Sequence, residues 1–250
     1  MTRSIVQQSF DTDAFGAPFY RIVDVDVAKL AEELPALTAK PPVIIDAKVP
    51  AADVATSAWL LRHGFRKICT QVELLWARSD RGTDVEQRDR MRQAGEASPW
   101  ERGVTLLDEL SMSEDELRAH ARNITRDRFN QDPTLSRESV QRLYERWILN
   151  SISGRCRVLR LGRSFFSFRE ERDSIRADLL SVLDKRQGHG GRLVACLIHH
   201  ARTIGASTIE VVTECENVPS WTLFTEAGFR LGGFQSVYHL VERENACERR

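Results

Sequence analysis

The stretch Lys185-Arg186-Gln187-Gly188-His189-Gly190 decides the predicted fold, because it stands between two apolar runs of different periodicity. Positions 175–182 form a strand-like run, and positions 193–204 repeat apolar residues at the spacing of a helix. Glycines let a backbone approach a ligand closely, and N–H groups at a helix start attract anions. The hexapeptide alone also suits an ordinary loop, but at a strand-to-helix turn it predicts a cradle for a pyrophosphate. We expect the side chain of His189 to point outward.

The spacing excludes two better-known phosphate-binding loops. The chain contains no G-x-x-x-x-G-K-[ST] sequence, so the stretch is not the NTPase loop. A dinucleotide fingerprint needs a third glycine in G-x-G-x-x-G, but position 193 is leucine. The cradle therefore belongs to another class of fold.

The segments that follow the loop complete a wider pattern. A helix ending at Gly205 leads into a strand over Thr208–Thr213, and then into the segment E-N-V-P-S-W-T-L-F-T-E-A-G-F at 216–229. This order resembles the Gcn5-related N-acetyltransferase (GNAT) superfamily. The superfamily's [QR]-x-x-G-x-[GA] motif has Lys185 in its first position here. Its N-x-x-A-x-x-x-Y-x-x-x-G-F helix is matched by Asn217, Ser220, Phe224, Gly228 and Phe229.

The resemblance implies an α+β GNAT fold, with a mixed, mostly antiparallel central sheet flanked by helices. It also implies acetyl-CoA as the acetyl donor. Residues expected to contact acetyl-CoA are Leu180, Val182, Lys185, Arg186, Gln187, Gly188, His189, Gly190, Gly191, Asn217 and Phe224.

The composition excludes several classes of protein. The 36 basic and 36 acidic residues cancel, and nothing in their distribution indicates a nucleic-acid partner. No apolar run reaches the roughly 18 residues of a membrane span, and the N-terminus lacks the apolar core of a signal peptide. We therefore expect a cytoplasmic protein without a membrane partner.

The cysteines and histidines do not form a metal-binding pattern. Adjacent His199 and His200 diverge on a helix, so they are poorly placed to hold one ion, and we predict no metal. The cysteines are scattered and odd in number, which favours a reducing compartment; they are Cys69, Cys156, Cys196, Cys215 and Cys247.

The chain is predicted to have two lobes. Residues 1–100 form a reduced GNAT-like lobe with strands near Phe19–Val25, Val43–Asp46 and Lys67–Trp76, and residues 101–250 form the acetyltransferase domain. The polar stretch Ser79–Trp100 is interpreted as a linker, and Glu242–Arg250 as a frayed tail.

An internal echo supports this division. The sequence Gly64-Phe65-Arg66 and the sequence Gly228-Phe229-Arg230 each follow a helix and precede a strand-like run. The first lobe has no K-x-x-G-x-G sequence, so we expect it to bind no cofactor. Chance similarity between two such short sequences is the alternative.

Two segments of the second lobe indicate the acceptor. R-F-x-x-D-P at 128–133 and L-Y-x-x-W-I-x-x-S at 143–151 resemble the acceptor-side helices of the TDP-fucosamine acetyltransferase group. The resemblance implies a nucleotide-linked amino sugar as acceptor, with contacts from Arg128, Phe129, Tyr144 and Trp147. Arg128 suits bidentate capture of a phosphate. Considered alone, the aromatic residues also suit a helix core.

The chemistry needs a base for the amine, donors for the oxyanion and a route for the thiolate to leave. Glu214 and His239 are the candidate bases, with a water chain as the alternative. Phe224 stands where the superfamily often has a tyrosine that protonates the thiolate, and Tyr238, Thr222, Ser220 or water could replace it.

Three functions remain open from the sequence. The first is acetylation of an amino sugar, and the second is acetylation of another amine, such as an antibiotic, a polyamine or a protein N-terminus. The third is binding of acyl-CoA without catalysis, which the phenylalanine at position 224 favours. A homodimer is expected only from the resemblance.

Overall fold

The computed structural model describes residues 3–78 and 103–243. The expected linker Ser79–Trp100, most of the expected tail Glu242–Arg250, and Cys247 lie outside this part. The elements within residues 3–78 are β1 (Ile5–Gln7), α1 (Ser9–Phe15), β2 (Phe19–Ile22), α2 (Val27–Thr38), β3 (Val43–Pro50), α3 (Val54–Arg62) and β4 (Arg66–Ala77). The later elements are β5 (Thr105–Glu109), α5 (Glu114–Asn123), α6 (Arg128–Gln131), α7 (Arg137–Ile152), β6 (Ser153–Leu161), β7 (Ser164–Glu170), β8 (Ser174–Ser181), α8 (His189–Ile204), β9 (Thr208–Glu214), α9 (Val218–Glu226) and β10 (Arg230–Glu242).

The described strands form one ten-stranded sheet in the order β1-β2-β3-β10-β4-β9-β8-β7-β6-β5. Among the neighbouring strands of this sheet in the described residues, β2/β3 and β8/β9 pair in parallel and the other pairs are antiparallel. The prediction of a mixed, mostly antiparallel sheet flanked by helices is therefore confirmed.

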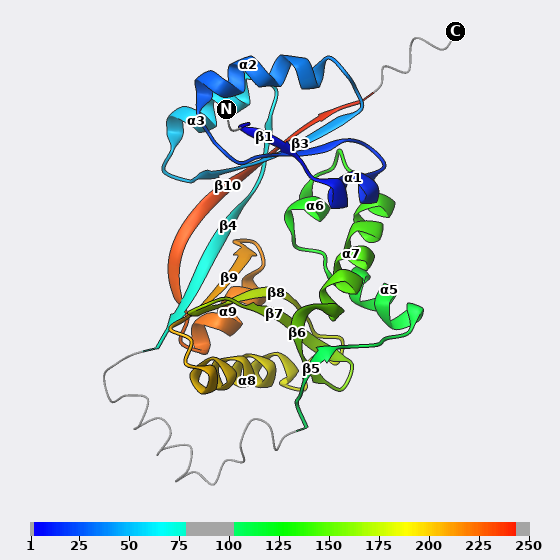
Figure 1. Ribbon diagram of the computed structural model, residues 1–250, viewed down its shortest axis with the longest axis vertical. Coiled ribbons are helices and arrows are strands. Elements are labelled where there is room, and N and C mark those ends of the chain that lie inside the picture. The colour runs from blue at the N-terminus through cyan, green and yellow to red at the C-terminus, as the bar shows by residue number, and fades with distance from the viewer. Residues whose placement is uncertain (1–2, 79–102, 244–250) are drawn as a thin grey trace.

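Helices cover both faces of this sheet. Helices α2 and α3 lie at one end of the molecule and α8 and α9 at the other, and the long strands β4 and β10 join the two ends (Figure 1). In β7, Phe166 packs in the apolar cluster under α8, whereas its neighbour Phe165 packs with α5 and α7. This alternation is expected where a strand is buried on both sides.

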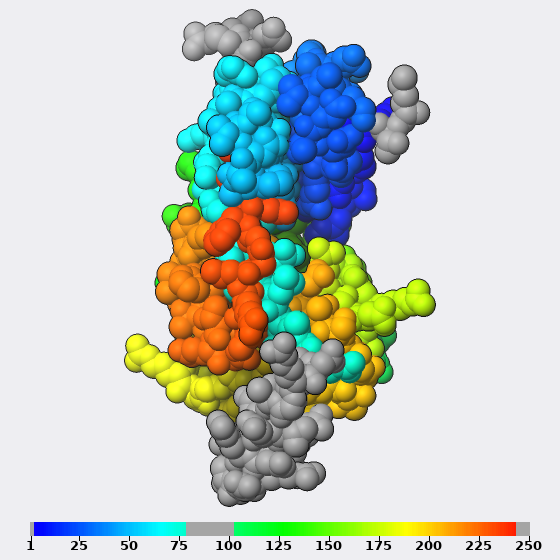
Figure 2. Space-filling view, turned by 90° about the vertical axis from the view of Figure 1, so that its left-hand side faces the viewer, coloured from blue at the N-terminus to red at the C-terminus, as the bar shows by residue number. Residues whose placement is uncertain are grey.

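The two Gly-Phe-Arg sequences adopt the same local structure. Gly64 and Gly228 both have positive φ, at 84° and 92°. After each glycine, a phenylalanine N–H returns to a carbonyl five residues earlier: Phe65 to Leu60 at 3.1 Å, and Phe229 to Phe224 at 3.0 Å. This is a Schellman-type helix end. The strands that follow, β4 and β10, pair with each other and reach the surface in Figure 2 (cyan and orange-red).

Strand ends differ from prediction for identifiable reasons. Strand β2 stops at Ile22, before the predicted end, because Asp26 caps α2 by accepting from the N–H groups of Ala28 and Lys29. Strand β3 continues to Pro50 because β10 pairs with it over its whole length. Helix α5 begins after the N-cap residue Ser113, whose Oγ accepts from the N–H of Glu116.

Candidate functional site

The strands β8 and β9 separate toward their C-terminal ends. Their parallel pairing runs only from Ser174/Thr208 to Arg176/Glu210. Beyond this point β8 stays paired with β7, and β9 stays paired with β4. The facing strand edges therefore carry backbone groups without a sheet partner, which can bind an extended ligand as an added strand does.

The predicted cradle lies beyond the end of β8, at the start of α8. Gly188 is the N-cap residue of α8, with φ of 71°, and no side chain caps the helix. Arg186 also has positive φ, at 62°. Lys185, Arg186 and Gln187 are exposed. Uncapped N–H groups at the start of a 16-residue helix, next to two cations, suit the pyrophosphate of acetyl-CoA.

Because Gly190 has no side chain, the start of α8 can lie close to α9 and to the end of β8. A Cβ at this position would lie 3.2 Å from Leu223 Cδ2 and 3.7 Å from Val182 Cγ2. A side chain here would crowd α9 and the end of β8, which border the cradle. Gly191 has open space around it and is exposed.

His189 does not point outward, so that prediction was wrong. Its ring is buried, with Nδ1 3.2 Å from Ser164 Oγ and 3.6 Å from Asp184 Oδ2. As the first residue of α8, His189 turns its side chain onto β7 beneath the loop. It can reach a cofactor only through its backbone in this position.

The end of β8 is held by α5. His120 Nδ1 lies 2.8 Å from Ser181 Oγ, and Asn123 Nδ2 donates to the carbonyl of Val182 at 3.3 Å. Burial lowers the pKa of His120 to about 4, so its imidazole is neutral near pH 7. Leu180 and Val182 are half-buried beside this anchor.

The helix after β9 supplies one polar and one apolar candidate. Asn217 lies immediately before α9, and its amide donates to Thr213 Oγ1 at 3.1 Å. Phe224 is fully buried, with its ring 6.0 Å from that of Phe166 and 5.1 Å from that of Phe229. Phe224 is thus a core residue in addition to its predicted place beside the cofactor.

Glu214 lies at the C-terminal end of β9, where the strands have separated. Its Oε1 accepts from Gln71 Nε2 at 2.9 Å and from the N–H of Arg128 at 3.3 Å. Burial raises the pKa of Glu214, the Gln71 hydrogen bond partly opposes this, and Asp127 adds to the rise. A carboxyl with a raised pKa at the mouth of a strand opening has the properties of a general base.

A buried carboxylate, Asp46 of β3, lies beside this group. Its Oδ2 accepts from Arg21 Nε at 3.2 Å, and its Oδ1 lies 3.8 Å from Arg128 Nε and 3.5 Å from His239 Nε2. Burial alone would raise the pKa of Asp46, but Arg128 and His239 hold it well below its ordinary value. Asp46 therefore stays charged and connects β2, β3, α6 and β10.

His239 is held between two carboxylates. Its Nδ1 donates to Asp132 Oδ2 at 2.7 Å, and its Nε2 faces Asp46. Burial lowers the pKa of His239, but the bonds to Asp132 and Asp46 raise it above its ordinary value overall. An imidazolium fixed in this way is suited to holding α6 against β10 rather than to accepting a proton.

Tyr238 lies on the other side of β10. Its side chain is buried in an apolar cluster with Trp59, Phe65 and Leu240. Adjacent strand residues face opposite ways, so Tyr238 is not brought together with His239 or Glu214.

The predicted acceptor residues are mostly enclosed. Arg128 is 7% exposed, and its guanidinium lies 4.2 Å from the ring centroid of Phe129, which stacks on His239 at 5.7 Å. Tyr144 is buried in the cluster that α7 forms with α1 and stacks on Trp147 at 5.8 Å. The structure thus places Arg128 beside Glu214, and Phe129 beside His239. Tyr144 is instead part of the apolar core.

Trp147 and Ser151 of α7 fix a bulge in β8. The register of β7 and β8 shifts at Asp178, whose carboxylate accepts from Trp147 Nε1 at 3.3 Å, and from the hydroxyls of Ser151 and Ser167. A bulge re-aims the backbone that follows it, here toward the separated edge of β8.

Sequence reasoning missed Asp46, Lys48, Gln71 and His120 as members of this region. One signal was available, because Asp46 interrupts the apolar run Val43-Ile44-Ile45-Asp46-Ala47. A charge inside a buried strand needs a partner. Its partners come from distant segments, which the sequence does not place.

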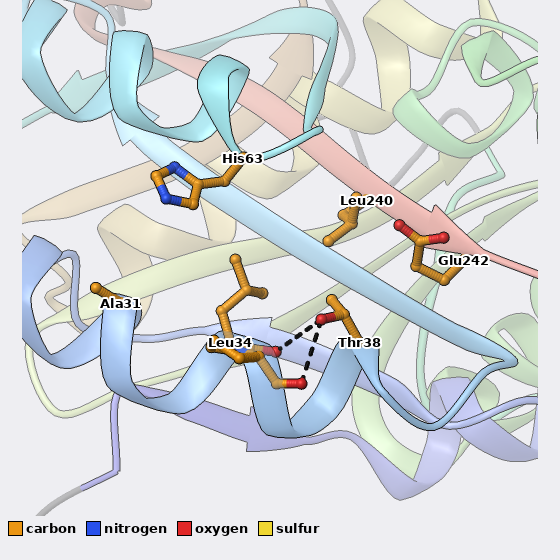
Figure 3. A pocket seen from close by; sticks show the side chains of 7 residues that line it. Ala31, Leu34, Thr38, His63, Leu240 and Glu242 are labelled. Atoms are coloured by element: carbon orange, nitrogen blue, oxygen red, sulfur yellow. Dashed lines mark hydrogen bonds between the residues drawn. The ribbon is translucent and has the colours of Figure 1, made fainter.

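Two cavities in the structure lie away from this region. One, of about 260 Å³, lies between α2, the end of α3 and β10, and Figure 3 shows Leu34, Thr38 and His63 around it. Leu240 lines this cavity and faces the opposite side of β10 from His239. The other, of about 310 Å³, borders β5, β6 and β7. Sheet pairing and charge, rather than cavity size, define the candidate site.

Within residues 3–78 and 103–243, no group of three or more His, Cys, Asp or Glu side chains is placed to hold a metal ion. No helix in the described part is long and apolar enough to cross a membrane.

Comparison with solved structures finds similar folds in other proteins. A GCN5-related N-acetyltransferase from Sphaerobacter thermophilus is 10% identical, with a TM-score of 0.56 over 96% of this chain and 76% of that chain. A GCN5-related N-acetyltransferase from Kribbella flavida is 12% identical, with a TM-score of 0.53 over 96% of this chain and 87% of that chain.

A third structure is the GCN5-related glucosamine N-acetyltransferase region of a fungal multi-domain GH3 β-N-acetylglucosaminidase. It is 12% identical, with a TM-score of 0.57 over 94% of this chain and 30% of that chain. No known family profile and no curated protein matches the sequence. At these identities the likeness shows the fold: the chain has the α+β GNAT fold that its sequence predicted.

Proposed function

We propose that this chain is an acyl-CoA-dependent N-acetyltransferase that acts on a small-molecule amine. The observation that carries the proposal is the separation of β8 from β9 beside an uncapped, glycine-rich helix start. The separated edge of β8 can bind the amide-containing arm of acetyl-CoA, and the start of α8 can bind its pyrophosphate.

Different residues of this region bind different parts of acetyl-CoA in this proposal. The N–H groups that follow Gly188 bind the pyrophosphate, and Lys185 and Arg186 add positive charge. The backbone of Leu180 to Val182 lies along the arm, and Asn217 binds it from the β9 side. When bound, acetyl-CoA supplies an acetyl group activated as a thioester.

Glu214 serves as the base in this proposal. An amine attacks only when neutral, so its ammonium must first lose a proton. The raised pKa of Glu214 brings it closer to the pH at which an amine is deprotonated. Gln71 and the N–H of Arg128 hold the carboxylate in one orientation, and backbone N–H groups of β8 face the developing oxyanion.

The thiolate leaves without a tyrosine acid. Phe224 has no proton to give, and Tyr238 faces the first-lobe core. A thiol of pKa about 8.5 is a tolerable leaving group, so water suffices to protonate it after departure.

The acceptor class that we propose is an amino sugar, including a nucleotide-linked one. The R-F-x-x-D-P and L-Y-x-x-W-I segments support this, as does the fungal structure described as a glucosamine N-acetyltransferase region. Arg128 is buried beside Asp46, so a phosphate would reach it only if the Asp46 contact loosened. Binding of acyl-CoA without catalysis is the competing function, favoured by Phe224.

The test is incubation of the pure protein with acetyl-CoA and a panel of amino sugars, free and nucleotide-linked. Amine-dependent release of free thiol, with a product heavier by one acetyl group, is expected. Thermal stabilisation by CoA without thiol release from any amine would instead indicate the binding function.

A further inference from the structure

One face of the sheet carries both Glu214 and a lysine that the proposed chemistry does not use. The register places Lys48 opposite Val237, Val237 opposite Cys69, and Gln71 opposite Glu214. Residues opposite each other, or two apart on one strand, share a face of a sheet. Lys48 and Glu214 are thus three strands apart on one face and offset by two residues along the strands, which is about 16 Å between Cα atoms in a flat sheet.

Most of the other charges beside them are paired; the exception in the described residues is Asp127, whose carboxylate accepts from the N–H groups of Phe129 and Asn130. Arg21 contacts Asp11 at 3.8 Å and Asp46 at 3.2 Å. Arg128 contacts Asp46 at 3.8 Å, and His239 lies 2.7 Å from Asp132. Three carboxylates therefore balance two guanidinium groups and one imidazolium.

Lys48 and Glu214 remain without a partner of opposite charge. Within the described residues, Lys48 makes no ion pair or hydrogen bond, although it is half-buried. Glu214 contacts only neutral donors, the Gln71 amide and the N–H of Arg128. Burial and repulsion by Arg128 lower the pKa of Lys48 to about 8, whereas Asp46 and, to a smaller extent, Glu214 act to raise it. Lys48 and Glu214 therefore lie on the same face of the sheet, and in the described residues neither has an ion-pair partner.

We propose that the acceptor carries an anionic group, a carboxylate or a phosphate, that binds Lys48 while its amine lies at Glu214. This inference rests on the proposed function and names the chemistry of its acceptor. The half-buried ammonium of Lys48 and the buried carboxylate of Glu214 each gain from a group of opposite charge. An acceptor with both charges supplies both groups, whereas a polyamine would place a second cation beside Lys48.

The test uses matched pairs of amines that differ in one anionic group. Glucosamine 6-phosphate is compared with glucosamine for the phosphate source, and an L-amino acid with its carboxamide for the carboxylate source. The proteins are wild type, Lys48→Gln and Lys48→Arg, with exposed Lys40→Gln as the matched control.

For wild type, we expect kcat/KM to be about tenfold higher for the anionic member of at least one pair, which identifies the source. Lys48→Gln should lose about tenfold on that member and nothing on the neutral one, while Lys48→Arg keeps the preference. Equal rates within both pairs, or an equal loss on both members in Lys48→Gln, would overturn the inference and leave N-acetylation standing.

A binding measurement separates the two proposals. With CoA present, the anionic compound should raise the unfolding temperature of wild type and Lys40→Gln, and should not raise that of Lys48→Gln. Such stabilisation without acetylation would support the anion site and defeat the proposed function. Absence of any difference between wild type and Lys48→Gln would defeat the anion site, whether or not acetylation occurs.

Discussion

The cofactor side and the acceptor side of the candidate site are built in different ways. The cofactor side comes mainly from one continuous segment, the loop at 185–190 and the helix α8 that follows it. The acceptor side joins Asp46, Arg128, Glu214 and His239, which come from β3, α6, β9 and β10. The first is determined by local backbone geometry, whereas the second exists only after distant strands have paired. Mutations on the cofactor side and mutations on the acceptor side should therefore have different effects.

The largest effect is expected from Asp46→Asn. This change leaves Arg128 and His239 without a shared buried carboxylate, and breaking such a pair costs about 3–5 kcal/mol. The free energy of unfolding in urea measures the loss. Asp24→Asn, at an exposed carboxylate paired with Lys29, is the control and should change little. Equal destabilisation by the two variants would refute the idea that Asp46 connects the elements.

The next effect is catalytic. Glu214→Gln keeps the size of the side chain and removes the base, so kcat should fall about 100-fold while CoA binding is unchanged. Because the pKa of Glu214 is raised, the wild-type rate should fall as the pH drops through that pKa. Glu216→Gln, an exposed neighbour, serves as control. Wild-type activity in Glu214→Gln would assign the proton to water instead.

The loop can be tested with two glycines at opposite ends of α8. Gly188 and Gly205 have similar positive φ, 71° and 81°, so alanine at either should cost about 1 kcal/mol of stability. Only Gly188→Ala should also weaken CoA binding, by about tenfold, which calorimetry would measure. If Gly205→Ala weakens CoA binding equally, the effect is general strain, and the loop has no special role.

The smallest effect concerns His239. Its pKa is raised in the fold, so its contribution to stability is complete below pH 6.5 and is lost as the pH rises through the folded value. Asp46, Asp132 and Arg128 are the charged groups that face it. Wild type should therefore lose more stability than His239→Gln between pH 6.5 and pH 8. Parallel stability curves for the two proteins would contradict a charged His239.

The same contrast explains what the sequence could predict. The helix start at Gly188 and the two glycine-closed helix ends follow from short-range rules, and the structure has them. The orientation of His189 was predicted wrongly because its ring contacts Ser164 of β7, which is distant in the sequence. Asp46 was not predicted as a site residue because its partners lie on elements that come together only in the folded sheet.

Amide hydrogen exchange with and without acetyl-CoA tests the central claim most directly. The separated edge of β8 and the loop at 185–190 should become protected when acetyl-CoA binds, while first-lobe strands β1 and β2 should not change. Protection confined to any other region, or none at saturating acetyl-CoA, would contradict the proposal that this opening holds the cofactor.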